Sequence, residues 1–182
     1  MKTLKFAATV LLLLVLNVSC SSDDSSPEPE PSTASFKIKA VSITARQFPD
    51  TEGDALELYG RISSTVTVDG ESEELILWDR NRDFFESIGT EAYLINSEGS
   101  EVTLTLTEEE LQNNAEFAFY AQMYDRDPDG NIDDYLGNEL RSQFARVFTT
   151  ISDENNPALF DFRLREFSGI DVRVRFSVEH IR

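Results

Sequence analysis

The chain has 182 residues, of which 40% are hydrophobic and 27% are charged, enough to build one globular domain around a hydrophobic core. It carries 34 Asp and Glu residues against 16 Lys and Arg residues, which gives a formal net charge of −18. A surface this acidic repels phosphate backbones, so the composition excludes nucleic acid as a partner. The single cysteine, Cys20, lies near the N-terminus, which leaves the remaining residues without disulfides or thiol chemistry.

Residues 1–19 have the pattern of a signal peptide. A short basic start precedes an apolar run at residues 10–16, which is too short to span a bilayer as a mature helix. Small and apolar residues then lead to Cys20 in a pattern that resembles a bacterial lipoprotein cleavage box, with Leu16 one place earlier than the usual leucine. We therefore expect acyl chains on Cys20, which would tether the mature protein to the membrane.

Residues 20–34 are expected to form a linker. Directly after the cysteine, residues 21–26 read S-S-D-D-S-S and resemble the export signal of surface lipoproteins in Bacteroidota-type bacteria. The following residues are rich in Ser, Pro and Glu, a composition that cannot build a core and favours an extended spacer. The predicted organisation is a signal peptide at 1–19, a lipidated linker at 20–34 and a folded domain at 35–182, exposed on the outer membrane of the cell envelope.

From residue 36 onward, apolar and polar residues alternate as they do in strands with one buried face. The expected strands lie at residues 36–40, 56–62, 75–78, 91–95, 102–106, 117–123, 143–150, 160–164 and 172–178. The alternation is weaker at residues 75–78, 91–95 and 143–150. Thr107 and Glu110 have the spacing of a capping box, which predicts one short helical turn. Without helical crossovers, this pattern predicts an all-β fold, an antiparallel β-sandwich of roughly eight strands.

An aspartate-rich segment follows the strand expected at residues 117–123. Five aspartates fall within ten residues, interleaved with Pro, Gly and Asn; they are Asp125, Asp127, Asp129, Asp133 and Asp134. Carboxylates on alternate residues of a tight loop suit Ca²⁺, which takes six to eight oxygen ligands. Unneutralised carboxylates this close repel by about 1 kcal/mol or more per pair, a cost that a cation removes. The alternative is a solvated acidic loop in which Asp serves as a turn residue.

An EF-hand also places ligands at this spacing, but its twelfth position requires a bidentate Glu, and Leu136 stands there. The strand-like flanks argue against an EF-hand as well. Residues 119–137 read F-Y-A-Q-M-Y-D-R-D-P-D-G-N-I-D-D-Y-L-G, which resembles the third calcium-binding loop of C-two domains, the eight-stranded sandwiches of protein kinase C type. The resemblance implies that Asp125, Asp127 and Asp133 are ligands with Asp134 beside them, and it does not require Asp129.

The first calcium-binding loop of that family has a counterpart in residues 48–60. The resemblance implies Asp50 as a ligand and leaves Asp54 and Glu57 as alternatives for the second position, because the usual Asp-Pro-Tyr is replaced by Glu57-Leu58-Tyr59. The number of calcium ions stays open.

The sequence shows little sign of an enzyme. His180 is the only histidine, and no nucleophile elbow, phosphate-binding loop or zinc motif is present. Trp78 continues the apolar run at residues 75–77, which favours core packing over an exposed platform for glycans.

Two hypotheses from different classes remain. The first is a calcium-dependent binding module at the cell surface, whose ligand is an anionic lipid, an acidic glycan or another surface protein. The second is a structural or assembly lipoprotein of an outer-membrane complex, in which calcium only staples the loops.

Overall fold

The structure, a computed structural model, describes residues 32–45, 55–127, 132–165 and 169–181, all of which lie in the compact unit Pro31–Arg182. Four of the predicted site residues, Cys20, Asp50, Asp54 and Asp129, fall outside these ranges. No helix among the described residues is long and apolar enough to cross a membrane.

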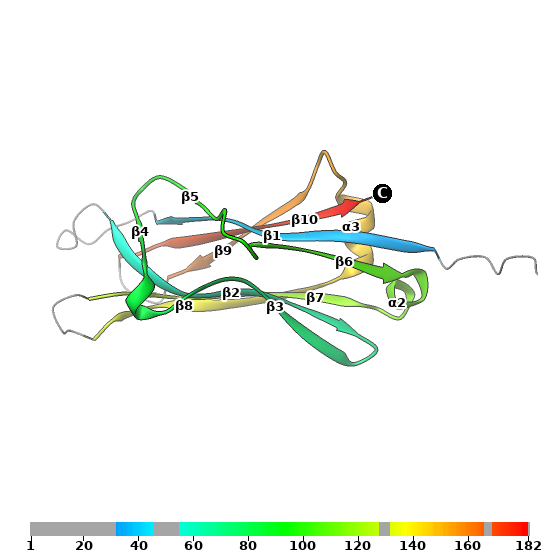
Figure 1. The fold of residues 1–182 in the computed structure, drawn as a ribbon, viewed down its shortest axis with the longest axis horizontal. Helices are drawn as coiled ribbons and strands as arrows, with labels where there is room; N and C mark the ends of the chain where they lie inside the picture. The colour runs from blue at the N-terminus through cyan, green and yellow to red at the C-terminus, as the bar shows by residue number, and fades with distance from the viewer. Residues whose placement is uncertain (1–31, 46–54, 128–131, 166–168, 182) are drawn as a thin grey trace, which may run out of the picture. The chain divides into compact units, whose positions relative to one another are not determined.

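The described residues form ten strands, two short α-helices and one 3₁₀ helix (Figure 1). In chain order these are β1 (Thr33–Ala45), β2 (Leu56–Val68), β3 (Glu71–Arg80), η1 (Arg82–Phe84), β4 (Glu86–Ile88), β5 (Tyr93–Leu94), β6 (Glu101–Thr107), α2 (Glu108–Gln112), β7 (Glu116–Asp125), β8 (Asp134–Phe144), α3 (Ala145–Ile151), β9 (Ala158–Leu164) and β10 (Val172–Ile181). The predicted all-β class is confirmed, whereas the expected number of eight strands is too low. Strand β5 lies within the expected range 91–95, whereas β4, which has three residues, and most of β8 were not expected.

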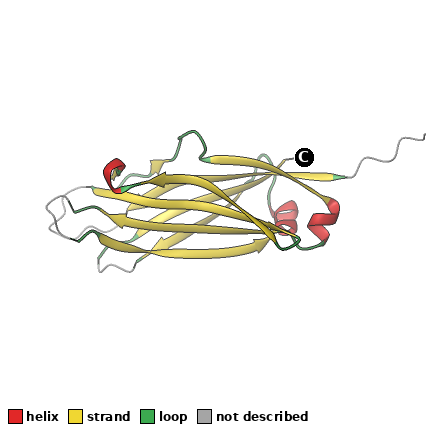
Figure 2. Ribbon diagram, turned by 60° about the horizontal axis from the view of Figure 1, so that its bottom comes forward, coloured by secondary structure: helices red, strands yellow, loops and turns green. Residues whose placement is uncertain are grey.

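The strands pair into two antiparallel sheets that lie face to face (Figures 1 and 2). In the first sheet, the order is β5–β1–β10–β9, with β6 also paired to β1. In the second sheet, the order is β3–β2–β7–β8, with β4 also paired to β2. This arrangement is the antiparallel sandwich that the sequence predicts.

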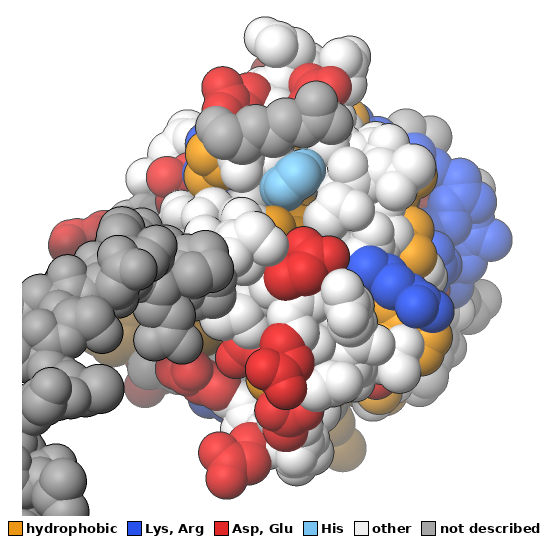
Figure 3. Space-filling view, turned by 90° about the vertical axis from the view of Figure 1, so that its right-hand side faces the viewer, with side chains coloured by type: hydrophobic (Ala, Val, Ile, Leu, Met, Phe, Trp, Pro, Cys, Tyr) orange, Lys and Arg blue, Asp and Glu red, His pale blue; other side chains and the backbone are white. Residues whose placement is uncertain are grey.

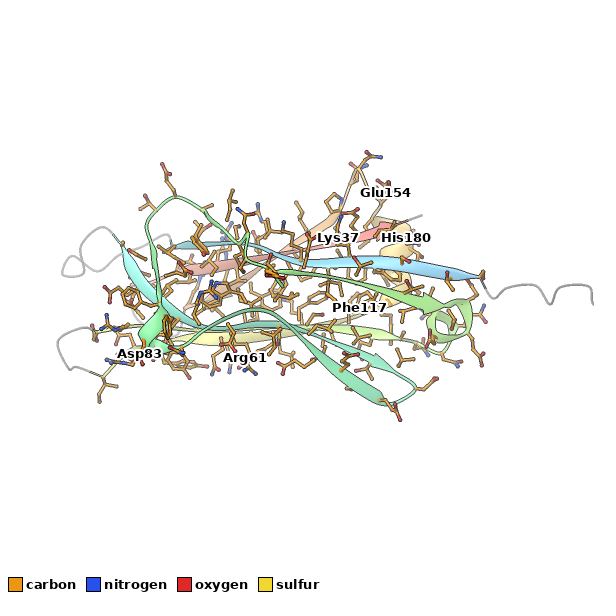
Figure 4. All side chains as sticks on the ribbon, in the orientation of Figure 1. Lys37, Arg61, Asp83, Phe117, Glu154 and His180 are labelled. Carbon is orange, nitrogen blue, oxygen red and sulfur yellow. The ribbon has the colours of Figure 1, made fainter. Side chains whose placement is uncertain are left out.

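The core lies between the sheets and is built by the period-two pattern. On β7, for example, Phe117, Phe119, Ala121 and Met123 are all at most 1% exposed, and the residues between them face outward. Phe119 meets Phe176 of the opposite sheet at a ring distance of 5.4 Å. Figure 4 shows Phe117 between the two layers.

The sandwich has two distinct ends. At the end that we call the loop end, β2, β8 and β10 begin, β1, β7 and β9 finish, and η1 follows β3 (Figure 1). At the opposite end, which we call the terminal end, β1 begins, β10 finishes, and α2 and α3 are found. The start of the domain is therefore far from the aspartate-bearing ends of β7 and β8.

Local signals for helices were only partly recognised in the sequence. The predicted capping box is present, since the Thr107 side chain accepts from Glu110 N–H and the Glu110 side chain accepts from Thr107 N–H. Residues 143–150, expected as a strand, instead continue β8 to Phe144 and then form helix α3. The reason is tertiary: Ala145 and Phe148, three residues apart, are both buried, as the helical period requires.

Gly60 marks a close approach between β2 and β7. Its φ is +141°, and a Cβ atom added there would lie 2.1 Å from the Gln122 carbonyl oxygen. A side chain is therefore sterically excluded at the residue that follows Tyr59.

The β8 and β9 strands are outer strands of opposite sheets, and one side chain connects them. The carboxylate of Glu139 on β8 accepts the backbone N–H of Arg163 on β9 at 2.8 Å. The same carboxylate forms an ion pair with Arg141.

Candidate functional site at the loop end

Asp133, one of the predicted calcium ligands, lies at the loop end in a bidentate ion pair with Arg82 of η1. The Arg82 Nε and Nη2 atoms donate to the two Asp133 carboxylate oxygens at 2.6 and 2.9 Å. The hydroxyl of Tyr59 donates to the same carboxylate at 2.8 Å, and the backbone N–H of Asp127 donates at 3.2 Å. These donors, Arg82 first among them, hold the pKa of Asp133 well below its usual range.

Tyr59 connects this ion pair to a row of aromatic side chains on the outer face of the second sheet. Its ring stacks on Tyr124 at 5.1 Å with an interplanar angle of 12°, and Tyr124 contacts Tyr135 at 5.2 Å. The register explains the row, because Tyr59 pairs with Tyr124 and Tyr124 pairs with Tyr135 across β2, β7 and β8. Burial, together with the hydrogen bond to Asp133, raises the pKa of Tyr59 to about 12. We call Tyr59, Tyr124 and Tyr135 the tyrosine row.

A second set of ion-pair contacts lies next to the first. The guanidinium of Arg126 donates to the Glu57 carboxylate at 2.8 Å and lies 4.7 Å from the centre of the Phe85 ring. The Asp125 carboxylate, on the buried face of β7 and only 6% exposed, accepts the backbone N–H of Glu57 at 2.8 Å. Two of the predicted ligands, Glu57 and Asp125, are thus held by protein donors.

The remaining described carboxylates of the aspartate-rich segment lie close by. Asp127 takes part through its main chain, because its carbonyl oxygen accepts from Arg82 at 3.2 Å in addition to its N–H bond to Asp133. Asp134 stands opposite Asp125 in the register of β7 and β8. The structure therefore brings Glu57, Asp125, Asp127, Asp133 and Asp134 to one end of the second sheet.

These carboxylates do not fit a calcium site in the arrangement observed. Among the described residues, no group of three or more His, Cys, Asp and Glu side chains is placed to hold a metal ion. Arg82 and Arg126 neutralise the charges of Asp133 and Glu57 that the sequence analysis assigned to a cation. Because Asp50, Asp54 and Asp129 lie outside the described ranges, calcium binding with their participation stays a prediction.

Sequence reasoning missed Arg82, Arg126 and the tyrosine row. Arg82 and Asp133 are 51 residues apart in sequence, and Tyr59 and Asp133 are 74 apart, so no local spacing connects them. One signal in the sequence could have revealed the role of Arg126. It is a basic residue within the aspartate cluster of an acidic chain, so its guanidinium is expected to form ion pairs with carboxylates.

Comparison with known proteins gives only distant structural likeness. No family model and no curated protein matches the chain. Human GIVD cytosolic phospholipase A2 aligns with 84% of this chain at 7% identity and a TM-score of 0.39, but the chain spans only 18% of the phospholipase. A C-two domain of plant extended synaptotagmin 1 aligns with 81% of this chain and 94% of its own, at 11% identity and a TM-score of 0.37.

A third solved structure, the Cry23Aa1 and Cry37Aa1 binary protein complex, aligns with 80% of this chain and 95% of its own, at 19% identity and a TM-score of 0.35. All three TM-scores are below 0.5, a level at which likeness assigns neither a family nor a function to this chain. The all-β sandwich class follows from the strand pairing itself.

Proposed function

We propose that the protein is a lipid-anchored module of the cell envelope that binds a ligand or partner at the loop end of its β-sandwich. The observation that carries the proposal is the tyrosine row beside the Arg82–Asp133 pair, on the outer face of the second sheet. The expected acyl chains on Cys20 supply the anchor. The proposal contains no catalytic step.

The chemistry of the loop end suits a glycan. Half-buried tyrosine rings offer apolar contact area, and the neighbouring guanidinium and carboxylate groups offer hydrogen bonds to hydroxyl groups. Trp78, the aromatic residue considered from the sequence, is only 2% exposed and packs in the core as predicted. The aromatic surface at this end consists of the half-buried tyrosine row and the exposed ring of Phe84 in η1.

Calcium has a limited place in this proposal. A calcium ion that used Asp133, together with the predicted ligands Asp50 and Asp127, would have to compete with Arg82 for the Asp133 carboxylate. We infer that any calcium affinity is set by this competition, so that removal of the Arg82 guanidinium would favour the metal.

A second candidate function, assembly with another surface protein, is favoured by a different observation. Ile151 of α3 and Leu159 of β9, both 56% exposed, line one pocket of about 320 Å³ together with Val147. Figure 3, which faces the terminal end, shows hydrophobic side chains next to Lys and Arg side chains on its right-hand flank. Exposed apolar groups that gather in this way are typical of protein contacts.

The anchor and the binding site are tested separately. Labelled fatty acid should be incorporated into the wild-type chain and not into Cys20→Ala, and an antibody should label intact cells that express the wild type. A Cys20→Ala chain that still takes up the label would contradict the anchor.

For the binding site, the full chain in mild detergent is tested against a glycan panel and against liposomes. Tyr124→Ala should lose glycan binding. Tyr120→Ala is the matched control, because Tyr120 is on the same face of β7 but outside the tyrosine row. Equal binding by the two variants, or binding to liposomes alone, would contradict the proposed site.

A further inference from the structure

A pocket of about 230 Å³ lies on the outer face of the first sheet, away from the tyrosine row. Its lining consists of Ser42, Thr44, Ala92, Arg173 and Arg175. The register explains why four of these residues meet: Ser42 of β1 pairs with Arg175 of β10, and Thr44 pairs with Arg173. A bulge between Ala40 and Ser42 shifts the alternation, so that both hydroxyl residues face outward beside the two arginines.

The two guanidinium groups are held in place by one carboxylate. Asp161 of β9 accepts from Arg175 Nε and Nη2 at 2.7 and 3.1 Å, and from Arg173 Nη1 at 3.3 Å. Two positive charges thus share a single negative charge. The carboxylate orients both arginines in advance without neutralising them.

Further positive charge stands next to the pocket. Arg163 of β9 is directly opposite Arg173 in the register of β9 and β10, and its side chain is exposed. Like charges that face each other across strands are destabilising. In a chain with a net charge of −18, this face thus brings three arginines together, a charge that attracts anions.

One donor in the pocket lining lacks an acceptor. The Nε atom of Arg173 is buried and has no hydrogen-bond partner within the described part of the chain. A buried N–H group without an acceptor is costly, and most such groups in native proteins are paired with protein, water or ligand. The neighbouring Ser42 is itself only 7% exposed.

We propose that this pocket is a binding site for an oxyanion, the carboxylate, sulfate or phosphate group of a molecule no larger than an acidic monosaccharide. The planar guanidinium groups of Arg173 and Arg175 match such groups geometrically. The hydroxyls of Ser42 and Thr44 supply additional donors. The site is independent of the loop end, because it uses β1, β9 and β10 of the other sheet.

The test is titration calorimetry on the full chain in mild detergent, at fixed ionic strength, with four probes: inorganic phosphate, sulfate, glucuronate and glucose. At least one anion should bind with one-to-one stoichiometry, and neutral glucose should not. Stronger binding of glucuronate than of the inorganic ions identifies a sugar carboxylate as the ligand, and the reverse order identifies a phosphate or sulfate group. Failure of all three anions to saturate the protein overturns the proposal.

Variants assign the binding to the pocket. The Arg173→Gln and Arg175→Gln substitutions should each raise the dissociation constant of the anion about tenfold or more, because each removes charged hydrogen bonds. The matched control is Arg61→Gln, which removes one positive charge from the outer face of the second sheet, where Arg61 pairs with Asp79 (Figure 4). An equal loss in Arg61→Gln would show unspecific attraction and overturn the proposal.

The Arg175→Lys variant tests the role of the guanidinium if a glutamine variant fails to fold. The charge is retained while the planar fork is lost, so the anion should still bind less tightly than in the wild type. Wild-type affinity in a folded Arg175→Lys chain, checked by its thermal melting curve, would refute the assigned role of the guanidinium.

Discussion

Substituting Gly60 by alanine should be among the most damaging single changes in the second sheet. The added Cβ would lie 2.1 Å from the Gln122 carbonyl oxygen, whereas ordinary contacts of this kind begin near 3.4 Å. One strand must therefore move by about 1 Å, in an interior that is packed too densely to absorb the shift. Because Gln122 and Met123 pair with β2 on one side and β8 on the other, the displacement disturbs three strands.

The expected loss combines two effects. A residue with a side chain at a φ of +141° costs about 1–2 kcal/mol, and forcing an extra carbon into a packed interior costs about 1–3 kcal/mol more. Gly70→Ala is the matched control. Its φ is also positive, +85°, but an added Cβ would meet nothing within 4 Å. Gly70→Ala should lose only about 1 kcal/mol, the cost of the backbone conformation.

Urea denaturation of the wild type and both variants measures these losses from the midpoints at a common slope. We expect Gly60→Ala to be less stable than Gly70→Ala by about 1–4 kcal/mol. Equal losses in the two variants would refute the reasoning, because backbone conformation alone would then explain both. Near-ultraviolet circular dichroism should also show a changed tyrosine signal in Gly60→Ala, since Tyr59 precedes the glycine.

Three further predictions concern pH, the core and calcium. Because the pKa of Tyr59 is raised from 10.0 to about 12, its contribution to stability is fully present below pH 10 and is lost as the pH rises towards 12. Burial also raises the pKa of Tyr93, so the wild type should show more than one late-ionising phenolate in an absorbance titration, and Tyr59→Phe should lose one of them. Phe176→Ala should lower the free energy of unfolding by about 3–5 kcal/mol in urea denaturation, because Phe176 is fully buried among three other phenylalanine rings. A loss below about 1 kcal/mol would contradict that packing. If calcium binds at the loop end, Asp127→Asn should lower the calcium affinity measured by calorimetry. Arg82→Gln should raise that affinity, because it frees the Asp133 carboxylate. Absence of binding heat at millimolar calcium in both the wild type and Arg82→Gln would exclude the site.

The sandwich class could be predicted because burial on one face imposes a pattern on each strand separately. On β10, Val172, Val174, Phe176 and Val178 are all fully buried, and the residues between them are not, so the period is visible without knowing any partner strand. The capping box at Thr107 and Glu110 was equally local. Such signals survive because each needs only a few consecutive residues.

Helix α3 could not be predicted because its helical form does not follow from its own consecutive residues. Its sequence, ARVFTTI, contains β-branched and aromatic residues that favour strands. Its helical form depends on distant contacts: Ala145 N–H donates to the Ala115 carbonyl oxygen at 2.7 Å, and Phe148 packs on Phe117 at 5.8 Å.

At the candidate site, the sequence located the acidic half and missed the basic half. Clustered aspartates repel one another, and the sequence analysis assigned the neutralising positive charge to a calcium ion. The source of the positive charge was not visible, because Arg82 comes from another connection of the same sheet, 51 residues before Asp133. A carboxylate cluster alone therefore does not distinguish a metal site from an arginine-neutralised one.

The contact between Glu139 and Arg163 bears on the behaviour of the protein in a crowded envelope. Outer strands of a sheet present unpaired N–H and C=O groups that can recruit a strand from another molecule and start aggregation. By accepting the N–H of Arg163 at 2.8 Å, the Glu139 side chain takes up a donor on β9 that an incoming strand would need. The Glu139 side chain extends from β8 to β9 of the other sheet. It therefore discourages the addition of a foreign strand at the edge of the sandwich where β8 and β9 are neighbours.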